Sequence, residues 1–330
     1  MRFAILGAGF MGATYAECLA HHVQGGELVV IAGGRRAPGL AERYGVDFAA
    51  DVRDAIARPD VDAVVVASPH SAHLEQAVFA ASLGKHVYAE KPLARTVADC
   101  DSILAACVQA PVALAVNSVT RFRDSPLAAK RLLTDGDVGE LRMIRGLCAV
   151  PGYLEDGGWT ADPEEGGAWL DWGVHGCDTL RWLTGSEPVE INGWAGDFGP
   201  GPALLRSAAA QFVFANGVVA QLLMTFESPS RAFGSQSFWQ IIGSLAVIEL
   251  DAYGRVELVR GDRRSLVHVQ ERFNKDSDTL SPIRLKAFAA QLSDFVAAVR
   301  EGRAPAVTGE DGRKAVAMVE AVKHTSHARA

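Results

Sequence analysis

Residues 2–12 read Arg-Phe-Ala-Ile-Leu-Gly-Ala-Gly-Phe-Met-Gly, and this stretch decides the fold of the first part of the chain. Its apolar residues predict a buried strand over Arg2–Leu6, and a helical pattern follows the last glycine. The loop between them has the spacing G-x-G-x-x-G, with loop positions Gly7, Gly9, Phe10, Met11 and Gly12. In this context the first glycine permits a tight turn, the second lets the backbone approach a pyrophosphate, and the third allows close helix packing. The helix N-terminus attracts phosphate, so the stretch predicts a dinucleotide-binding loop rather than a structural turn alone.

The first third of the chain continues this alternation of apolar runs and helical segments. The further predicted strands are Leu28–Ala32, Val61–Ala67, His86–Ala89 and Val112–Val116. One helical pattern runs from Ser71, as N-cap, to Gly84, and another starts at Thr96, where Asp99 completes a capping box. This alternation predicts a doubly wound parallel sheet of the Rossmann type, with helices on both faces, in a dinucleotide-binding domain over residues 1–119.

After about Thr120 the pattern changes to a second class of structure. A helix opens at Ser125-Pro126, and a Gly-, Asp- and Glu-rich segment over 151–167 predicts a loop over a site. The predicted strands are Leu141–Ala149, Glu190–Ala195, Ala209–Phe214, Val218–Phe226, Phe238–Ile242, Ala246–Leu250 and Val256–Val259. Asn216-Gly217 is a strong hairpin signal between two of them. These runs predict an open, mostly antiparallel sheet.

The tail returns to helix. Ser281-Pro282 is a helix start, and a final helix is expected after Thr308. One apolar stripe repeats at steps of three and four through Leu285, Phe288, Leu292, Phe295 and Val299. We therefore predict a C-terminal α+β domain over residues 120–330, for substrate binding and oligomerisation.

Composition narrows the class of protein. The chain has 330 residues, 49% of them hydrophobic, and a net charge of −7 with no dense basic block, which argues against nucleic-acid binding. No run approaches the ~20 apolar residues of a membrane span, and the start lacks the features of a signal peptide, so a cytoplasmic protein is expected. The five cysteines are scattered without a CxxC pair, so we interpret them as buried hydrophobes rather than disulfides or zinc ligands.

The end of the second predicted strand bears on cofactor choice. NAD enzymes usually carry an acidic residue there, which binds the ribose 2′-hydroxyl, but this strand ends in Ala32-Gly33-Gly34-Arg35-Arg36. Two guanidinium groups can pair with a 2′-phosphate, and no carboxylate is there to repel it. The sequence therefore favours NADP(H) at Gly34, Arg35 and Arg36, with NAD(H) as the alternative if the two arginines are ordinary solvated charges.

Several motifs together resemble a known family. The strand Val61–Ala67 leads into Ser68-Pro69-His70, and the next strand leads into Glu90-Lys91-Pro92, at the sheet edge where open α/β folds bind ligands. With residues 166–178, GGAWLDWGVHGCD, and the closing GEDGRKA, the chain resembles the glucose-fructose oxidoreductase, inositol dehydrogenase and rhizopine-catabolism (Gfo/Idh/MocA) family over nearly its whole length. The EKP motif is fairly specific, and its combination with D-x-x-x-H is more so.

The resemblance implies roles at the first domain's sheet edge. Lys91 would lie beside the nicotinamide and contact the reacting hydroxyl, whereas from the residues alone a solvated lysine is an equal alternative. The other positions implied to be cofactor-side, with a cis Lys91-Pro92 bond, are Ser68, Pro69, His70, His73, Glu90, Pro92 and Asn117. A metal interpretation of His70-x-x-His73 is rejected because no third and fourth ligand with zinc-like spacing accompanies the pair. A turn role is the alternative for Asn117.

The segment around Asp171 and His175 matches the family's substrate-side helix. If it is helical, the two side chains share a face, and both can meet a substrate hydroxyl. His175 suits proton acceptance as the hydride leaves, and Asp171 would contact the substrate and bias the imidazole. The alternatives are a buried core histidine and a helix-terminus carboxylate. Asp178 either orients His175 or forms a helical ion pair. Inositol dehydrogenases carry this Lys, Asp and His set, whereas other members have Tyr at the His position.

The predicted loop gives a hint about the substrate. Tyr153–Glu165 carries no Lys or Arg, and its acids are Glu155, Asp156, Asp162, Glu164 and Glu165. If these acids face the site they repel anions, and Trp159 and Trp169 can stack on a sugar ring, which favours a neutral sugar or cyclic polyol. The alternative is a solvated loop whose acids point outward.

The combined prediction is a hydride-transferring NAD(P)-dependent dehydrogenase or reductase acting on a secondary hydroxyl or ketone of a sugar or polyol. Lys91 would polarise the reacting oxygen, His175 would be the general acid/base, and Asp171 would support both. The rival hypotheses are a redox-neutral sugar-modifying enzyme with retained NAD(H), for elimination or glycosidic cleavage, and a sugar-sensing regulator. The open sheet predicts a homodimer or homotetramer through the C-terminal domain.

Overall fold

A computed structural model describes residues 1–150, 159–201, 203–229, 236–271 and 280–325. The chain forms two compact units, of which unit 1 is Met1–Val119 with Asn274–Val316 and unit 2 is Thr120–Phe273 with Ala317–Ala330. The sequence-based assignment placed everything after residue 119 in one domain. The structure differs because helix α8 (Pro282–Glu301) packs against α1 (Phe10–His21) in unit 1, burying its apolar stripe there.

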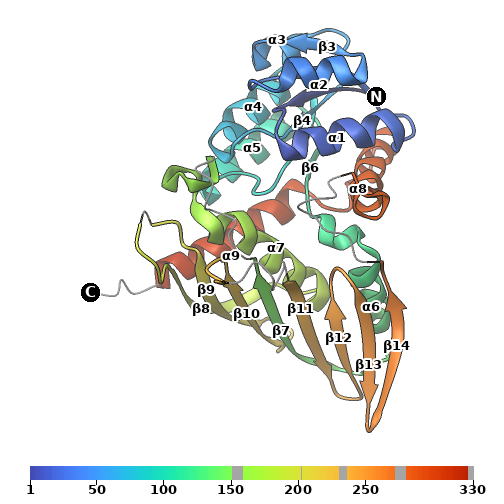
Figure 1. Ribbon diagram of the computed structural model, residues 1–330, viewed down its shortest axis with the longest axis vertical. Helices are drawn as coiled ribbons and strands as arrows, with labels where there is room; N and C mark the ends of the chain where they lie inside the picture. Colours follow the sequence, from blue (N-terminus) through green and yellow to red (C-terminus); the bar gives the residue numbers. More distant parts are fainter. Residues whose placement is uncertain (151–158, 202, 230–235, 272–279, 326–330) are drawn as a thin grey trace. The chain divides into compact units, whose positions relative to one another are not determined.

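Unit 1 is built on a parallel sheet in the order β3-β2-β1-β4-β5-β6. In Figure 1 the chain of these strands runs from blue to blue-green. Its strands are β1 (Arg2–Leu6), β2 (Glu27–Ala32), β3 (Asp47–Ala49), β4 (Ala63–Val66), β5 (His86–Ala89) and β6 (Leu114–Val116). The other helices of this part are α2 (Ala37–Tyr44), α3 (Val52–Ala57), α4 (His70–Ser82) and α5 (Val97–Gln109). The strand order reverses between β1 and β4, which is the switch point where such sheets bind ligands. The predicted doubly wound sheet is confirmed.

Local signals explain most of these elements. The residues of β4 are all buried, as expected for a central parallel strand. The Thr96 hydroxyl accepts a hydrogen bond from the backbone N–H of Asp99, so the predicted cap is confirmed. The prediction of Ser71 as N-cap is wrong. Helix α4 begins at His70 with Pro69 as its N-cap, and proline at that position fixes the backbone without needing a side-chain cap.

Unit 2 contains an eight-stranded sheet in the order β14-β13-β12-β11-β7-β10-β9-β8. Its strands are β7 (Leu141–Ala149), β8 (Pro188–Gly196), β9 (Ser207–Phe214), β10 (Val219–Thr225), β11 (Gln236–Gly243), β12 (Val247–Asp251), β13 (Arg255–Arg260) and β14 (Arg263–Val269). All neighbouring pairs are antiparallel except β7 with β10. The hairpin predicted at Asn216-Gly217 joins β9 to β10. The mostly antiparallel sheet is confirmed.

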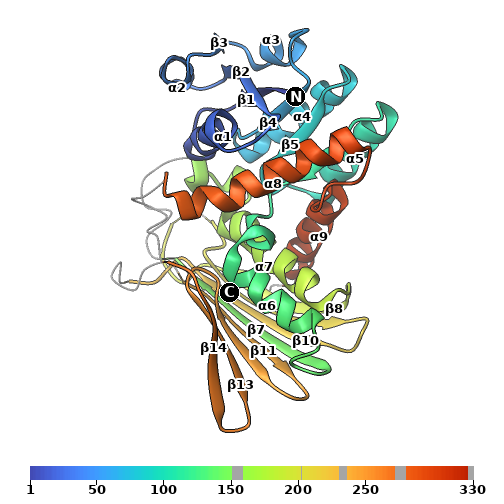
Figure 2. The ribbon, with the colours of Figure 1, turned by 90° about the vertical axis from the view of Figure 1, so that its right-hand side faces the viewer.

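Helices cover one face of this sheet (Figure 2). The helices concerned are α6 (Asp124–Thr134) and α7 (Gly167–Thr184), and helix α9 (Gly309–Thr325) ends in the same unit. Along β7, Ile144 and Cys148 are buried under α7 while Met143 and Arg145 are exposed on the other face. A Cβ on Gly176 would overlap the side chain of Leu222, so glycine permits the close approach of α7 to β10.

Among the helices of the described ranges, none is long and apolar enough to span a bilayer. All five cysteines lie in those ranges and are buried thiols, which agrees with their interpretation as buried apolar residues. Burial raises the pKa of Cys107 to about 11, so this thiol is a poor nucleophile at neutral pH.

Candidate functional site

The glycine loop of unit 1 has the geometry that a dinucleotide requires. Gly7 has φ 107°, and a Cβ there would lie 2.5 Å from the carbonyl oxygen of Ala67, while a Cβ on Gly12 would overlap the carbonyl oxygen of Gly7. At Gly9 a Cβ would meet no protein atom within 4 Å, so this glycine leaves open space over the helix. Helix α1 carries no acid in its first turn and no side-chain cap. Its N-terminal N–H groups and their positive potential therefore suit an anionic pyrophosphate.

The end of β2 presents two cations. After Ala32 the chain turns through Gly33 and Gly34, with φ of 80° and 81°, a backbone that other residues rarely adopt. Arg35 and Arg36 follow, and both are exposed at the start of α2. This segment has no carboxylate of its own, so its local charge is suited to an additional phosphate.

Lys91 lies two residues after the end of β5, at the carboxyl edge of the parallel sheet, and is partly exposed. The preceding residue, Glu90, is buried at 5% exposure. One of its carboxylate oxygens accepts hydrogen bonds from the Tyr15 hydroxyl and from Asn117 Nδ2 at 2.9 Å, and the other accepts the backbone N–H of Lys91 at 3.0 Å. Glu90 was predicted to lie on the cofactor side, but its carboxylate turns into the core and holds the backbone of Lys91.

His73 holds the same segment from the other side. Its ring is fully buried, with Nδ1 2.9 Å from the Pro92 carbonyl oxygen and Nε2 3.0 Å from that of Ser68. The imidazole thus links the chain after β4 to the chain after β5. The resemblance placed His73 on the cofactor side; its ring is fully buried, so in that position it would act through the backbone segments that it links. The bond between Lys91 and Pro92 is cis, as the family resemblance implied.

The remaining predicted residues of this edge lie close by. Ser68 donates its hydroxyl to Gln76 at 2.8 Å, Pro69 is the N-cap of α4, and the buried His70 ring lies 5.8 Å from that of His73, centroid to centroid. Asn117 follows β6, and its buried side-chain oxygen has no hydrogen-bond partner among the residues that the structure describes. Among the residues described, no three His, Cys, Asp or Glu side chains gather as a metal site would require.

Helix α7 of unit 2 carries the second set of predicted residues. Asp171 is buried and His175 is partly exposed, one turn apart on the same side of the helix. The His175 ring lies edge-on to that of Trp172, with centroids 5.7 Å apart and planes at 66°. An imidazole at the surface of the helix beside a buried carboxylate can exchange a proton with a bound hydroxyl.

Asp178, one turn further, belongs to a buried ion-pair network. Its carboxylate accepts two hydrogen bonds from the Arg121 guanidinium, at 2.9 and 2.5 Å, and lies 3.8 Å from Arg181. Arg181 in turn pairs with Glu187 at 2.7 Å. Of the two roles left open for Asp178, these contacts favour the ion pair.

Two tryptophans were predicted to stack on a sugar. For Trp169 this is wrong, because its indole is fully buried and donates a hydrogen bond to the Val319 carbonyl oxygen at 3.1 Å. Residues six positions apart in an α-helix are offset by about 120° around the helix axis. Trp169 and His175 therefore face different directions. The side chain of Trp159 and residues 151–158, which include Glu155 and Asp156, lie outside the described part of the chain.

The described acidic residues of the loop differ in their exposure to solvent. Asp162 accepts the backbone N–H of Glu164 at 3.0 Å and begins the 3-10 helix Pro163–Glu165. Glu165 is buried, whereas Asp162 and Glu164 are exposed. The expectation of an acidic face toward the substrate therefore stays a prediction.

Two residues near these groups were missed. Tyr15 binds Glu90 across 75 positions of sequence, and no local pattern indicates such a contact. Trp172 lies three residues before His175, so helical spacing alone was a signal for its position. The Trp172 ring also contacts that of Phe226, the residue directly after β10, with ring centroids 5.6 Å apart. Only the tertiary structure reveals this contact.

A parallel sheet with a glycine loop at its switch point defines a dinucleotide-binding enzyme of the Rossmann class. The chain belongs to the GFO/IDH/MocA family. Residues 1–118 match the model for the oxidoreductase family with an NAD-binding Rossmann fold, and residues 127–249 match the GFO/IDH/MocA C-terminal domain. The fold and the family together make it an NAD(P)-dependent oxidoreductase.

Relatives and solved structures of this family extend over nearly the whole chain. It is 28% identical to myo-inositol 2-dehydrogenase of Thermotoga maritima, over 98% of this chain and 95% of that protein. It is 29% identical to 1,5-anhydro-D-fructose reductase of Ensifer adhaerens, over 94% and 92%. The crystal structure of myo-inositol 2-dehydrogenase from Lactobacillus plantarum superposes with a TM-score of 0.82 at 25% identity, covering 99% of this chain and 97% of that one.

Proposed function

We propose that this protein is a dehydrogenase or reductase that moves a hydride between a nicotinamide and a secondary hydroxyl or ketone carbon of a neutral sugar or cyclic polyol. The observation that supports it most is the placement of Lys91 at the carboxyl edge of the parallel sheet, after β5, with its backbone held by Glu90 and by the His73 link at Pro92. The named activities of the two relatives, on an inositol and on an anhydro sugar, point to the same substrate class.

Each part of the proposed site has its own role in the hydride and proton transfer. The glycine loop holds the pyrophosphate, the nicotinamide supplies the hydride acceptor or donor, and Lys91 holds and polarises the reacting oxygen. His175 accepts the hydroxyl proton during oxidation and returns it during reduction, and Asp171 supports the substrate and the imidazole.

A lysine substitution tests this division. Lys91→Met is expected to lower kcat by about 10²–10⁴-fold, the range for loss of a proton-transfer or polarising group, while the Kd for the dinucleotide changes less than threefold. The matched control is Lys286→Met, because Lys286 is an exposed lysine on α8 of the same unit. A Lys91→Met enzyme with kcat within threefold of wild type contradicts the assignment.

We infer a preference for NADP(H). The support is the pair of exposed guanidinium groups of Arg35 and Arg36 on a turn without a carboxylate. Replacing both by Ala is expected to weaken NADPH binding at least tenfold, as loss of charge-assisted phosphate contacts does, and to leave NADH binding within twofold. Arg43→Ala, which removes an exposed charge from the far end of α2, is the control. Equal weakening of both cofactors contradicts the preference.

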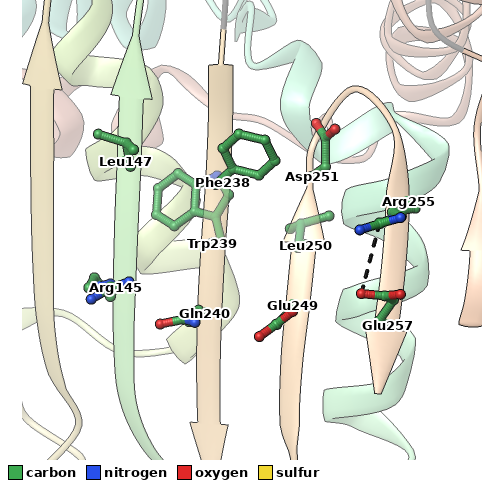
Figure 3. A pocket seen from close by; sticks show the side chains of 10 residues that line it. All are labelled: Arg145, Leu147, Phe238, Trp239, Gln240, Glu249, Leu250, Asp251, Arg255 and Glu257. Atoms are coloured by element: carbon green, nitrogen blue, oxygen red, sulfur yellow. Dashed lines mark ion pairs between the residues drawn. The ribbon is translucent and has the colours of Figure 1, made fainter. Parts of the chain in front are cut away.

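We also propose that a homodimer or homotetramer forms through the outer face of the unit 2 sheet. The neighbouring strands β11, β7 and β10 expose Phe238, Met143 and Leu223 at 39%, 48% and 52%. Phe238 also lines a hollow of about 260 Å³, together with charged side chains that include Arg145 and Glu249 (Figure 3). Single exposed apolar side chains are normal on a protein surface, whereas neighbouring ones on adjacent strands are typical of an interaction site. Leu223→Glu is expected to reduce the mass measured by light scattering, and a monomeric wild type contradicts this proposal.

The redox-neutral alternative uses the same residues. One relative, 29% identical over 57% of this chain and 50% of its own length, is a 2,7-anhydro-N-acetylneuraminate hydratase. Cofactor that copurifies with the protein, together with sugar conversion that needs no added NAD(P), would favour that function over net hydride transfer.

A further inference from the structure

In its first three turns, helix α7 exposes only two side chains to solvent, and each only in part. Over residues 167–178, the side chains that stay partly exposed are Trp172 and His175, and all others are buried. They lie three residues apart, about 60° around the helix. Whatever approaches the His175 imidazole along this helix therefore also meets the Trp172 indole.

The Trp172 ring is held in a defined position. It packs edge-on against both His175 and Phe226, with centroids 5.7 and 5.6 Å apart and planes at 66° and 68°. Phe226 is buried at 4% exposure, so it supports the indole from the core. An indole fixed by two T-shaped contacts loses little conformational entropy when a ligand binds to it.

We propose that Trp172 is the specificity-determining residue of this enzyme, and that it packs against the apolar C–H face of the ring whose hydroxyl exchanges its proton with His175. This inference rests on the proposed function and adds to it a requirement on the shape of the substrate. A ring with equatorial hydroxyls presents several C–H bonds together on one face and suits the indole. An open-chain polyol has no such rigid face, and an axial hydroxyl on that face would be desolvated against carbon without a partner.

A purely supporting role for Trp172 makes a different prediction. If the indole only orients His175, its removal changes the proton-transfer step, so kcat and the pH midpoint of kcat change. If it binds the ring, its removal weakens ground state and transition state equally, so KM rises while kcat stays nearly constant.

The experiment uses the full-length enzyme with saturating dinucleotide and a panel of myo-inositol, scyllo-inositol, D-glucose and the open-chain polyol D-glucitol. Trp172→Leu removes the flat ring and Trp172→Phe keeps a smaller one. Trp182→Leu is the matched control, because Trp182 is also partly exposed on α7, in its last turn beside Lys130. Substrate-induced quenching of tryptophan fluorescence provides a binding readout that is independent of turnover.

We expect Trp172→Leu to raise KM for the best ring substrate about tenfold, which corresponds to about 1.4 kcal/mol of lost binding. We also expect kcat within threefold of wild type, an unchanged pH midpoint, and partial recovery of KM in Trp172→Phe. Quenching by the ring substrate should persist in Trp182→Leu and be lost in Trp172→Leu.

Four results overturn the inference while leaving the proposed function intact. Three concern the variants: an unchanged KM in Trp172→Leu, an equal rise of KM in Trp182→Leu, and a shifted pH midpoint of kcat in Trp172→Leu. The fourth is an equal kcat/KM for D-glucitol and the ring substrates in wild type. Absence of dinucleotide-dependent turnover with every member of the panel refutes the proposed function, and the inference with it.

Discussion

His73 is expected to remain neutral at physiological pH, although both of its ring nitrogens face carbonyl oxygens. A neutral imidazole has one N–H and can donate to either Pro92 or Ser68 at a time, whereas an imidazolium would satisfy both carbonyls. Full burial opposes the charged form, and the neighbouring His70 opposes it further, so the pKa of His73 is lowered to about 4 from an ordinary value of 6.5.

This lowered pKa makes folding dependent on pH. Between pH 6.5 and 4 the unfolded chain binds a proton at His73 and the folded chain does not, so stability is complete above pH 6.5 and is lost as the pH falls toward 4. At 1.36 kcal/mol per pH unit, the difference between the two pKa values amounts to about 3 kcal/mol. Because the His73 imidazole is fully buried, solvent does not screen it, and this free-energy difference is not reduced.

Two measurements test the prediction. In ¹H–¹³C NMR spectra of histidine-labelled protein, the resonance missing from His73→Gln identifies His73, and its titration midpoint is expected near pH 4. Urea unfolding of wild type is expected to lose up to about 3 kcal/mol more than His73→Gln between pH 7 and 4, because glutamine keeps a hydrogen-bond donor that does not titrate. A midpoint above 6.5, or equal pH dependence in the two proteins, would show that the two carbonyls outweigh burial.

Two further predictions concern packing and the glycine loop. Asp178→Asn removes the charge of a buried carboxylate that accepts two hydrogen bonds from the Arg121 guanidinium, so the free energy of unfolding should fall by about 3–5 kcal/mol. Glu187→Gln, at the half-exposed end of the same network, should cost less than about 1 kcal/mol. Equal losses in urea unfolding would contradict this account of the network. Gly12→Ala places a methyl group on the Gly7 carbonyl oxygen and is expected to weaken dinucleotide binding about tenfold or more. Gly39→Ala, on the exposed side of α2 with open space around it, should leave binding unchanged.

Much of the fold could be predicted because many of its strands are short apolar runs next to turn residues. The predicted bounds of Arg2–Leu6, His86–Ala89 and Leu141–Ala149 match β1, β5 and β7. Strand β14 was missed because none of its residues is buried and it shows no apolar alternation. The apolar stripe of α8 predicted a buried face, but nothing in its spacing says which unit buries it.

The positions of candidate residues were predictable where a motif ties a residue type to a fixed place in an element. The glycine loop before α1, Lys91 after its strand, and Asp171 with His175 on one helix are of this kind. Contacts between distant segments were not predictable, as the Tyr15 bond to Glu90 illustrates. The choice between Trp169 and Trp172 depended on which side of α7 meets the sheet, and residues 167–178 are too apolar throughout to indicate that side.

The most direct test of the central claim is titration of the purified protein with NADPH and NADH by fluorescence, followed by absorbance in the reduced-nicotinamide band with sugars and inositols. The account predicts saturable binding, tighter for NADPH, and turnover that depends on a ring polyol or sugar. Failure to bind either dinucleotide, with the protein folded and free of retained cofactor, would contradict it.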